Sequence, residues 1–422
     1  MYSPAITDRR LARARKEGMK YKRLPREDSI AIAAELAKLV LDKDGKPTPD
    51  NSLRRPLQRS EEEFIASELL LCKCDFEYFM TRYWAIELDA GVTRDGASGI
   101  GPALPLESQL RYITLWGRRE AECHAELAKH GQTVGILCYI HKCRQVVATT
   151  TVRAASAHRM VFWPGTRAFA ASLDETRLSE IYTRDTLGLY NLPWWMRPKQ
   201  RAGQFPVDVK NTEIAFDPPV SSRISYQPEN AQQGIGVGSQ MDVSHLTEVA
   251  LWKYPGRINF SFIPGVPKAA TTFHVQESTA DGKGYWYEVT EGARHKRRGY
   301  ENWVYAFIPW WYNIRKNRLV APDDWTPDDH TARHGELVER TSPEFLDGQT
   351  FVPTRGQLYW WETERARHAS AGELSSFLTN YPATPEQSFV GFANSALPVE
   401  LVEILETETM FPGACYVPEM AA

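Results

Sequence analysis

Several absences narrow the class of this protein. The six cysteines show no C-x-x-C spacing, so the sequence predicts neither a zinc site nor a disulfide framework. No hydrophobic run approaches the length that crosses a membrane, and the first residues form no apolar signal segment. The formal net charge of −3 gives no overall excess of positive charge, which many nucleic-acid-binding chains carry. The 422 residues, 42% of them hydrophobic and 24% charged, are typical of a globular protein of a reducing compartment, with room for two or more domains.

One segment carries the strongest chemical signal. Residues 133–151 (TVGILCYIHKCRQVVATTT) read as a buried strand, a loop, and a helix that begins near Thr149. Backbone N–H groups and the helix dipole favour an anion at such a helix N-terminus, and Lys142 and Arg144 add positive charge there. The sequence therefore predicts a phosphate-binding loop.

The loop departs from the usual phosphate-loop pattern G-x-x-x-x-G-K-[ST]. Its two glycine positions hold Lys142 and Val147, and Ala148 stands where the lysine is usual. Residues 142–150 (KCRQVVATT) instead resemble the K-x-R-Q-x-G-x-S-T loop of bacteriophage terminase large subunits, the ATPases that pump DNA into procapsids. In many members of that family the lysine begins the loop, as Lys142 does here. Val147 replaces the family's glycine, and we expect a handicap to nucleotide binding or turnover because a β-branched residue resists a positive φ and crowds a phosphate.

A glutamine upstream of the loop fits the same resemblance. Gln109, in PLESQLR (105–111), resembles the glutamine with which terminases read adenine. A side-chain amide can both donate to and accept from an adenine edge. The alternative interpretation is a solvated glutamine in the first turn of a helix.

A second buried strand precedes a candidate general base. The segment MDVSHLTEVALW (241–252) ends its strand in Thr247 and Glu248, and its H-L-[ST]-E-x-A-x-W pattern resembles terminases. Phosphate-loop ATPases place an Asp-Glu pair there, in which the aspartate holds the metal and the glutamate orients or deprotonates the attacking water. Glu248 is therefore the general-base candidate, and with Thr247 in the aspartate's place the metal's second protein contact has no candidate. The alternative role for Glu248 is an acidic residue that complements the dipole of a following helix.

Three later segments also resemble terminase landmarks. TTFHVQESTADG (271–282) ends a strand in Ser278 and Thr279 and is similar to the E-S-T-A-x-G segment thought to couple hydrolysis to movement. Hydroxyls at that position can sense a γ-phosphate by hydrogen bonding. FIPWW (307–311) and NYPATPEQSF (380–389) are the other two. The order and spacing of all these segments agree over roughly residues 75–392, which is more specific than any single motif.

The pattern of strands and helices predicts an α/β fold. After the first strand (133–140), it predicts helices over 150–162 and 174–188 and strands over 167–172 and near 212–216, 222–226, 241–246, 271–277 and 302–308. Such alternation predicts a mainly parallel central sheet flanked by helices. The resemblance implies a P-loop NTPase of the RecA/ASCE type with a helical N-terminal region. Lys142, Glu248 and Ser278 all follow strand carboxyl ends, where such sheets bind ligands, so we expect one cleft to gather them.

We predict three segments along the chain. Residues 1–59 are a basic N-terminal arm and helix, 60–392 the ATPase motor domain, and 393–422 a C-terminal linker or tail. Full-length terminases continue into a nuclease domain, which does not fit in the tail, so nuclease activity is not expected from this chain. A truncated chain, a split gene and a decayed remnant are the alternatives for its absence.

The resemblance implies a mechanism and partners. ATP and Mg²⁺ are the implied cofactors: Lys142 contacts the phosphates, Thr149 provides the metal's hydroxyl ligand, and Arg144 stabilises developing charge. The other implied nucleotide-binding residues are Gln109, Gln145, Thr150, Ser278 and Thr279. The implied partners are double-stranded DNA, a portal protein, a small terminase subunit and further copies of the chain in a ring, with no membrane, in the host-cell cytoplasm.

Two other classes of function remain open from the sequence. One is another P-loop DNA translocase, such as a helicase-like motor. The other is a non-catalytic or weakly active descendant that binds DNA or partners without hydrolysis, which Val147, Ala148 and Thr247 favour.

Overall fold

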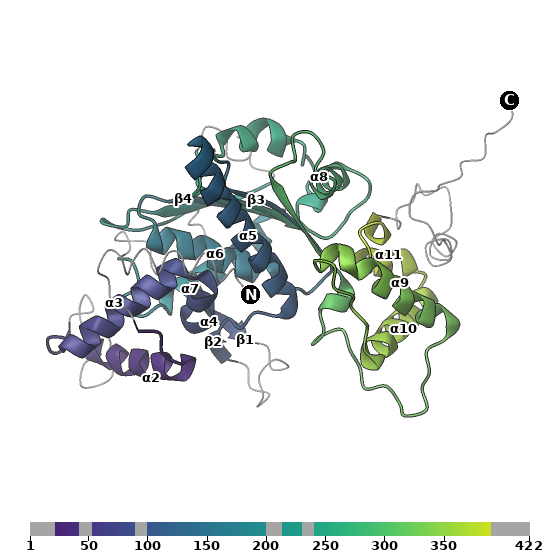
Figure 1. Cartoon of the computed structure of the whole chain (residues 1–422), viewed down its shortest axis with the longest axis horizontal. Coiled ribbons are helices and arrows are strands. Elements are labelled where there is room, and N and C mark those ends of the chain that lie inside the picture. Colours follow the sequence, from purple (N-terminus) through teal and green to yellow (C-terminus); the bar gives the residue numbers. More distant parts are fainter. Residues whose placement is uncertain (1–21, 42–52, 89–98, 200–212, 230–239, 390–422) are drawn as a thin grey trace. The chain divides into compact units, whose positions relative to one another are not determined.

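The structure of the chain is a computed structural model that describes residues 22–41, 53–88, 99–199, 213–229 and 240–389 (Figure 1). Most of the predicted basic arm and the whole of the predicted tail lie outside these ranges. The chain divides into two compact units. The first comprises residues 1–140, 146–278 and 288–306, and the second comprises 141–145, 279–287 and 307–422. The motor domain predicted over 60–392 contributes to both units, and the sequence did not suggest this division.

Helices dominate the N-terminal part of the first unit. They are α2 (Arg26–Ala37), η1 (Lys38–Val40), α3 (Arg59–Cys74) and α4 (Phe76–Tyr83). A small antiparallel hairpin of β1 (Ala85–Leu88) and β2 (Gly99–Pro102) follows. The apolar pattern of residues 60–83 predicts one continuous helix. This prediction is wrong in one respect, because the helix breaks at Asp75. Its carboxylate accepts a hydrogen bond from the Tyr78 N–H (3.0 Å) and so caps a new helix, a role for which aspartate is strongly preferred.

A seven-stranded, mainly parallel sheet confirms the predicted α/β fold. The strand order is β5-β6-β4-β7-β8-β3-β9. The strands are β3 (Ile136–Lys142), β4 (Arg167–Ser172), β5 (Glu213–Ala215), β6 (Arg223–Pro228), β7 (Val243–Thr247), β8 (Phe273–Ser278) and β9 (Trp303–Ile308). Strand β4 runs parallel to β6 and β7, and β7 runs parallel to β8, whereas β5 is antiparallel to β6. Every predicted strand from residue 133 onward is present with similar bounds.

The helices α6 (Ala148–Phe162) and α7 (Glu175–Tyr190) pack against one face of this sheet. The helices α5 (Glu107–His130) and α8 (Tyr285–Arg294) also lie between β2 and β9 in the chain. α6 and α7 pack side by side against the strands (Figure 1). α6 spans the face that carries Phe273 and Glu277, because the Arg159 guanidinium lies 4.0 Å from the Phe273 ring centre and Thr149 bonds to Glu277. Ala168 of β4 is also on this face by register, and its small side chain lets the helix approach closely.

The opposite face of the sheet carries a different set of side chains. Phe169, Ser244 and His274 share it by register, since in-register residues of parallel strands point the same way. Phe262, at the end of the π-helical turn η4 (Ile258–Phe262), packs against the rings of Phe169 and His274. Two short 3-10 turns, η3 (Val249–Leu251) and η5 (Ile263–Gly265), flank η4.

The second unit is helical and rich in tryptophan. Its elements are η6 (Trp310–Tyr312), α9 (Asp329–Phe345), α10 (Arg355–Ser370), α11 (Leu374–Asn380) and η7 (Gln387–Phe389). His334 stacks between Trp310 and Trp361, with ring centres 5.8 and 3.8 Å away, and Trp360 stacks on Trp310. These aromatic rings are buried, so they form a packing core.

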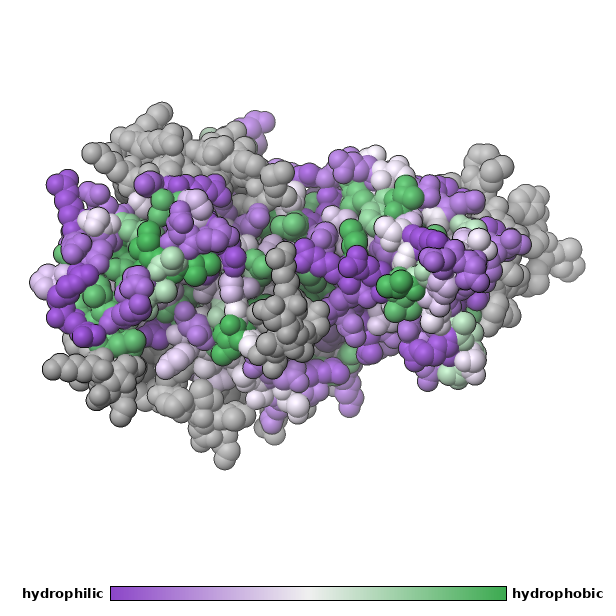
Figure 2. Space-filling view, turned by 90° about the horizontal axis from the view of Figure 1, so that it is seen from below, coloured by the Kyte–Doolittle hydropathy of each residue, from purple (hydrophilic) through white to green (hydrophobic). Residues whose placement is uncertain are grey.

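Among the described residues, no helix is both long and apolar enough to cross a bilayer. The face seen in Figure 2 mixes hydrophilic residues with separate groups of hydrophobic ones.

Candidate functional site

The loop between β3 and α6 has an unusual backbone. Gln145 and Val147 both have a positive φ, of 63° and 54°, and Val147 immediately precedes the first residue of α6. A β-branched residue in the left-handed region is strained, and glycine adopts the same conformation at little cost. Position 147 therefore has the left-handed backbone conformation that favours glycine, the residue of the terminase pattern, although this chain has a valine there.

Gln109 anchors this loop. Its side chain is buried (5% exposed), and its Nε2 donates to the Val147 carbonyl (3.1 Å) and to the Thr151 hydroxyl (2.7 Å). Its Oε1 accepts from the Leu106 N–H (2.6 Å) at the start of α5. The alternative of a solvated glutamine is therefore wrong. Adenine recognition by Gln109 stays a prediction, and would require the amide to exchange these internal bonds.

The predicted phosphate-binding residues divide between the two units. Lys142 ends β3 and is buried, whereas the side chains of Arg144 and Gln145 are exposed; all three belong to the second unit, as does the buried Thr279. Thr149, Thr150, Glu248 and Ser278 belong to the first unit, together with Gln109. The expectation that one cleft gathers Lys142, Glu248 and Ser278 stays a prediction.

Within the second unit, the terminase-like landmark at 380–389 holds the start of the loop. The Arg144 N–H donates to the Asn380 carbonyl (2.9 Å). His141 lies against the rings of Phe307 and Phe389, and its Nε2 is 2.9 Å from the Ser388 hydroxyl. These contacts join segments more than 160 residues apart, so no local pattern in the sequence predicted them.

Within the first unit, a buried carboxylate lies beside the predicted metal ligand. Thr149 donates its hydroxyl to Glu277 Oε1 (2.6 Å), and Thr247 donates to the same oxygen (2.8 Å). His245 Nε2 lies 3.3 Å from that oxygen. Glu277 and His245 have no exposed surface, and Thr247 is 3% exposed. Burial lowers the pKa of His245, and Glu277 only partly offsets this.

Sequence reasoning missed Glu277. It belongs to the segment that resembles E-S-T-A-x-G, but the following hydroxyls drew the functional assignment. The missing signal was register: Thr247 and Glu277 are direct partners across the parallel pair of β7 and β8. A match of this kind between two buried strands could have been found by aligning their carboxyl ends.

The general-base candidate stands on a strained turn. Glu248 has a φ of 56° and directly follows β7. The Ala250 N–H donates to the Ser278 hydroxyl (3.1 Å), which fastens this turn to the end of β8. Glu248 stands at the N-terminus of a 3-10 turn of only three residues, so its alternative role of complementing a helix dipole applies to a single turn. Thr150, 9% exposed, lies in the first turn of α6.

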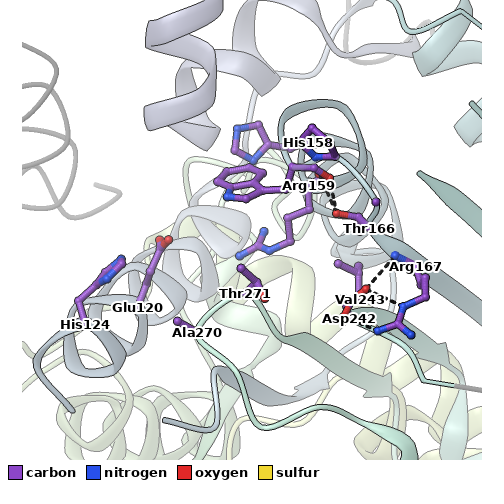
Figure 3. A pocket seen from close by; sticks show the side chains of 13 residues that line it. Glu120, His124, His158, Arg159, Thr166, Arg167, Asp242, Val243, Ala270 and Thr271 are labelled. Atoms are coloured by element: carbon purple, nitrogen blue, oxygen red, sulfur yellow. Dashed lines mark hydrogen bonds and ion pairs between the residues drawn. The ribbon is translucent and has the colours of Figure 1, made fainter. Parts of the chain in front are cut away.

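A pocket of about 430 Å³ lies elsewhere in the first unit (Figure 3). His158 and Arg159, from the last turns of α6, line it together with Arg167 and Asp242, at the start of β4 and just before β7. Arg167 Nη2 and Asp242 Oδ1 are 3.1 Å apart, so these two charges pair with each other. The pocket is at the amino ends of the strands. Glu248 and Ser278 are at the carboxyl ends, where sheets of this kind bind ligands.

Comparisons with known proteins give matches only among solved structures. No protein-family model matches the sequence, and no curated protein matches it. The large terminase of bacteriophage HK97 aligns with 9% identity over 73% of this chain and 54% of its own length, at a TM-score of 0.45. The large terminase ATPase domain of Thermus phage P74-26 aligns with 12% identity over 62% of this chain and 92% of its own, at 0.38. The large terminase of a thermophilic bacteriophage aligns with 11% identity over 52% and 50%, at 0.32.

The coverage differs among these matched structures. The chain spans about half the length of the large terminases from HK97 and from the thermophilic bacteriophage, and most of the P74-26 ATPase domain. These solved structures are all phage large terminases, the family that the sequence motifs of the chain also resemble.

Proposed function

We propose that this chain is the ATP-hydrolysing motor of a viral DNA-packaging terminase. The observation that carries the proposal is the strand–loop–helix unit from β3 to α6. Its backbone takes the left-handed conformation at the family's glycine position and leads into a helix N-terminus, which favours phosphate. Thr149, on the first turn of that helix, bonds to a buried carboxylate, the pairing that a magnesium–phosphate site uses.

The proposed roles follow the residues of the loop and the strand ends. Lys142 contacts the nucleotide phosphates, with Gln145 and Thr150 beside them, and Arg144 stabilises the charge that develops during transfer. Glu248 orients or deprotonates the attacking water. Its strained turn supports this role, because left-handed non-glycine residues cluster at functional sites.

Two further roles concern the adenine and the γ-phosphate of the nucleotide. Gln109 reads adenine, and Ser278 and Thr279 sense the γ-phosphate. The partners are double-stranded DNA, a portal protein, a small terminase subunit and further copies of this chain in a ring, in the host-cell cytoplasm. Nuclease activity is not part of the proposal.

Magnesium fits the residues present. Among the described residues no group of three or more histidine, cysteine or acidic side chains could hold a metal ion. Mg²⁺ in nucleotide sites does not need such a group, because it keeps several waters and is bound by one or two protein oxygens and the phosphates. The Thr149 hydroxyl provides one such oxygen. When bound, the ion neutralises charge on the transferring phosphoryl group.

The proposal is tested by ATP hydrolysis of the purified chain, measured with and without double-stranded DNA. We expect turnover that Glu248→Gln abolishes, while the matched change Glu213→Gln on the edge strand β5 leaves it intact. Stimulation by double-stranded DNA would support translocation. Turnover equal in wild type and Glu248→Gln would overturn the assignment of the base.

A second candidate function is a descendant that binds nucleotide or partners without hydrolysis. Val147 in a glycine conformation and Thr247 in place of aspartate favour it. Val147→Gly separates the two candidates: a gain in turnover supports a working motor, and no turnover in either protein supports the non-catalytic descendant.

A further inference from the structure

We propose that Glu277 supplies from β8 the metal-holding carboxylate that β7 lacks. This inference rests on the proposed ATPase function and assigns the second protein contact of its magnesium ion. Phosphate-loop ATPases take that carboxylate from an aspartate at the end of the strand that carries the general base. Here the position is Thr247, whose neutral hydroxyl lacks the negative charge that a carboxylate offers a divalent cation.

The register of the sheet places Glu277 where a substitute is needed. Thr247 and Glu277 are direct partners on adjacent parallel strands, so their side chains point to the same face. Neighbouring strands are about 4.8 Å apart. A carboxylate moved from β7 to β8 therefore shifts by one strand spacing, and glutamate, one methylene longer than aspartate, can reach back toward the vacated position.

The hydrogen bonds show that the Glu277 side chain extends from β8 to the end of β7. A single carboxylate oxygen accepts from Thr247 on β7 (2.8 Å) and from Thr149 on α6 (2.6 Å). The Thr149 hydroxyl is the proposed metal ligand, so the carboxylate of Glu277 lies one hydrogen bond from a residue that would hold the ion. Thr247 then orients the carboxylate, a positioning role that its hydroxyl can fill.

The electrostatics of this position also favour a cation site. Glu277 is completely buried, and burying a carboxylate is costly unless hydrogen bonds or a cation offset the lost hydration. Hydroxyl donors and the N-terminus of α6 offset part of this cost. A divalent ion held by Glu277 and Thr149 would offset more of this cost and would neutralise charge on the phosphates.

The test measures metal binding directly, with Mn²⁺ as a paramagnetic probe. Electron paramagnetic resonance titrations would follow Mn²⁺ binding to the protein saturated with ADP, and a separate titration would follow ADP binding in EDTA. Glu277→Gln should weaken Mn²⁺ affinity by roughly 10- to 100-fold, the range found when groups that orient metal ligands are removed. ADP affinity in EDTA should change little.

Three further variants make the result specific. Thr247→Ala should have a small effect, because the carboxylate remains. The exchange Thr247→Asp with Glu277→Thr returns the carboxylate to β7 and should restore much of the Mn²⁺ affinity. Glu68→Gln is the matched control, since Glu68 is equally buried and accepts hydrogen bonds from Tyr78 and Tyr83 far along the chain from the loop.

The outcomes separate the inference from the proposed function. Mn²⁺ affinity at the wild-type level in Glu277→Gln overturns the role of Glu277 and leaves the ATPase proposal standing. A wild-type protein that binds ADP neither in EDTA nor with Mn²⁺ overturns the ATPase proposal, and the inference with it. If Glu277→Gln fails to fold, the exchange variant decides: Mn²⁺ binding supports the inference, and a folded exchange variant without it refutes the inference.

Discussion

Val147→Gly should stabilise this protein, although replacing valine by glycine usually does the opposite. Val147 has φ 54° and ψ 31°, directly before α6, and its side chain is only partly buried. The left-handed conformation costs a non-glycine residue of order 1–3 kcal/mol. Glycine removes that cost.

The expected net effect is smaller than the strain. Glycine loses more backbone freedom on folding, which costs roughly 0.5–1 kcal/mol. The balance is a gain of up to about 2.5 kcal/mol in the free energy of unfolding. Nucleotide affinity should also rise, because a glycine no longer crowds the phosphates.

Urea unfolding at 25 °C measures the stability, and titration with a fluorescent ATP analogue measures the affinity. Ala148→Gly is the control, because the next residue begins the helix and should lose up to about 1 kcal/mol when replaced by glycine. If Val147→Gly loses as much stability as Ala148→Gly, the strain at position 147 is not real and the reasoning is refuted.

Three further predictions concern other parts of the first unit. Asp185→Asn should lower the free energy of unfolding in urea by about 3–5 kcal/mol, because the buried Arg153 guanidinium loses the carboxylate that lies 2.7 Å away. The control Glu180→Gln, at an exposed residue, should change this free energy little. Equal losses in the two variants would contradict the prediction. Burial, helped by the neighbouring His245, lowers the pKa of His274 to about 3. Between pH 7.5 and 5.5 the unfolded chain therefore binds a proton at this residue that the native state does not, and stability should fall by about 1.4 kcal/mol from this group alone. His274→Gln should lose that much less over the same range, and an equal loss would argue against a neutral buried histidine. Gln109→Leu should accelerate amide hydrogen exchange at residues 147–151, because the side-chain amide of Gln109 links the loop to α5. Unchanged exchange would show that the loop keeps its conformation without these hydrogen bonds.

The sheet could be predicted from the sequence because strand signals are local. Residues 167–172 were predicted as a strand and form β4 with the same bounds, since a short apolar run between turn residues leaves few alternatives. The break at Asp75 was missed because a capping aspartate inside a continuous apolar pattern resembles an ordinary helical residue. The two units could not be foreseen, because contacts such as those of His141 with Phe389 join distant segments.

The candidate site was predictable only in part for the same reason. A loop motif consists of neighbouring residues, so the sequence alone predicted the strand–loop–helix segment and Glu248. The contact of Thr149 with Glu277 spans 128 residues and depends on strand register and on the placement of α6, which no pattern in one sequence states. The backbone conformation at Val147 could not be predicted either, because valine rarely adopts a positive φ.

Calorimetric titration with a non-hydrolysable ATP analogue and Mg²⁺ tests the central claim most directly. Wild type and Lys142→Ala would be compared with Lys129→Ala, which removes an exposed lysine near the end of α5. The account predicts one binding site that Lys142→Ala weakens strongly and Lys129→Ala does not. No binding by the wild type, or equal binding by all three proteins, would contradict the claim that the loop after β3 holds nucleotide phosphates.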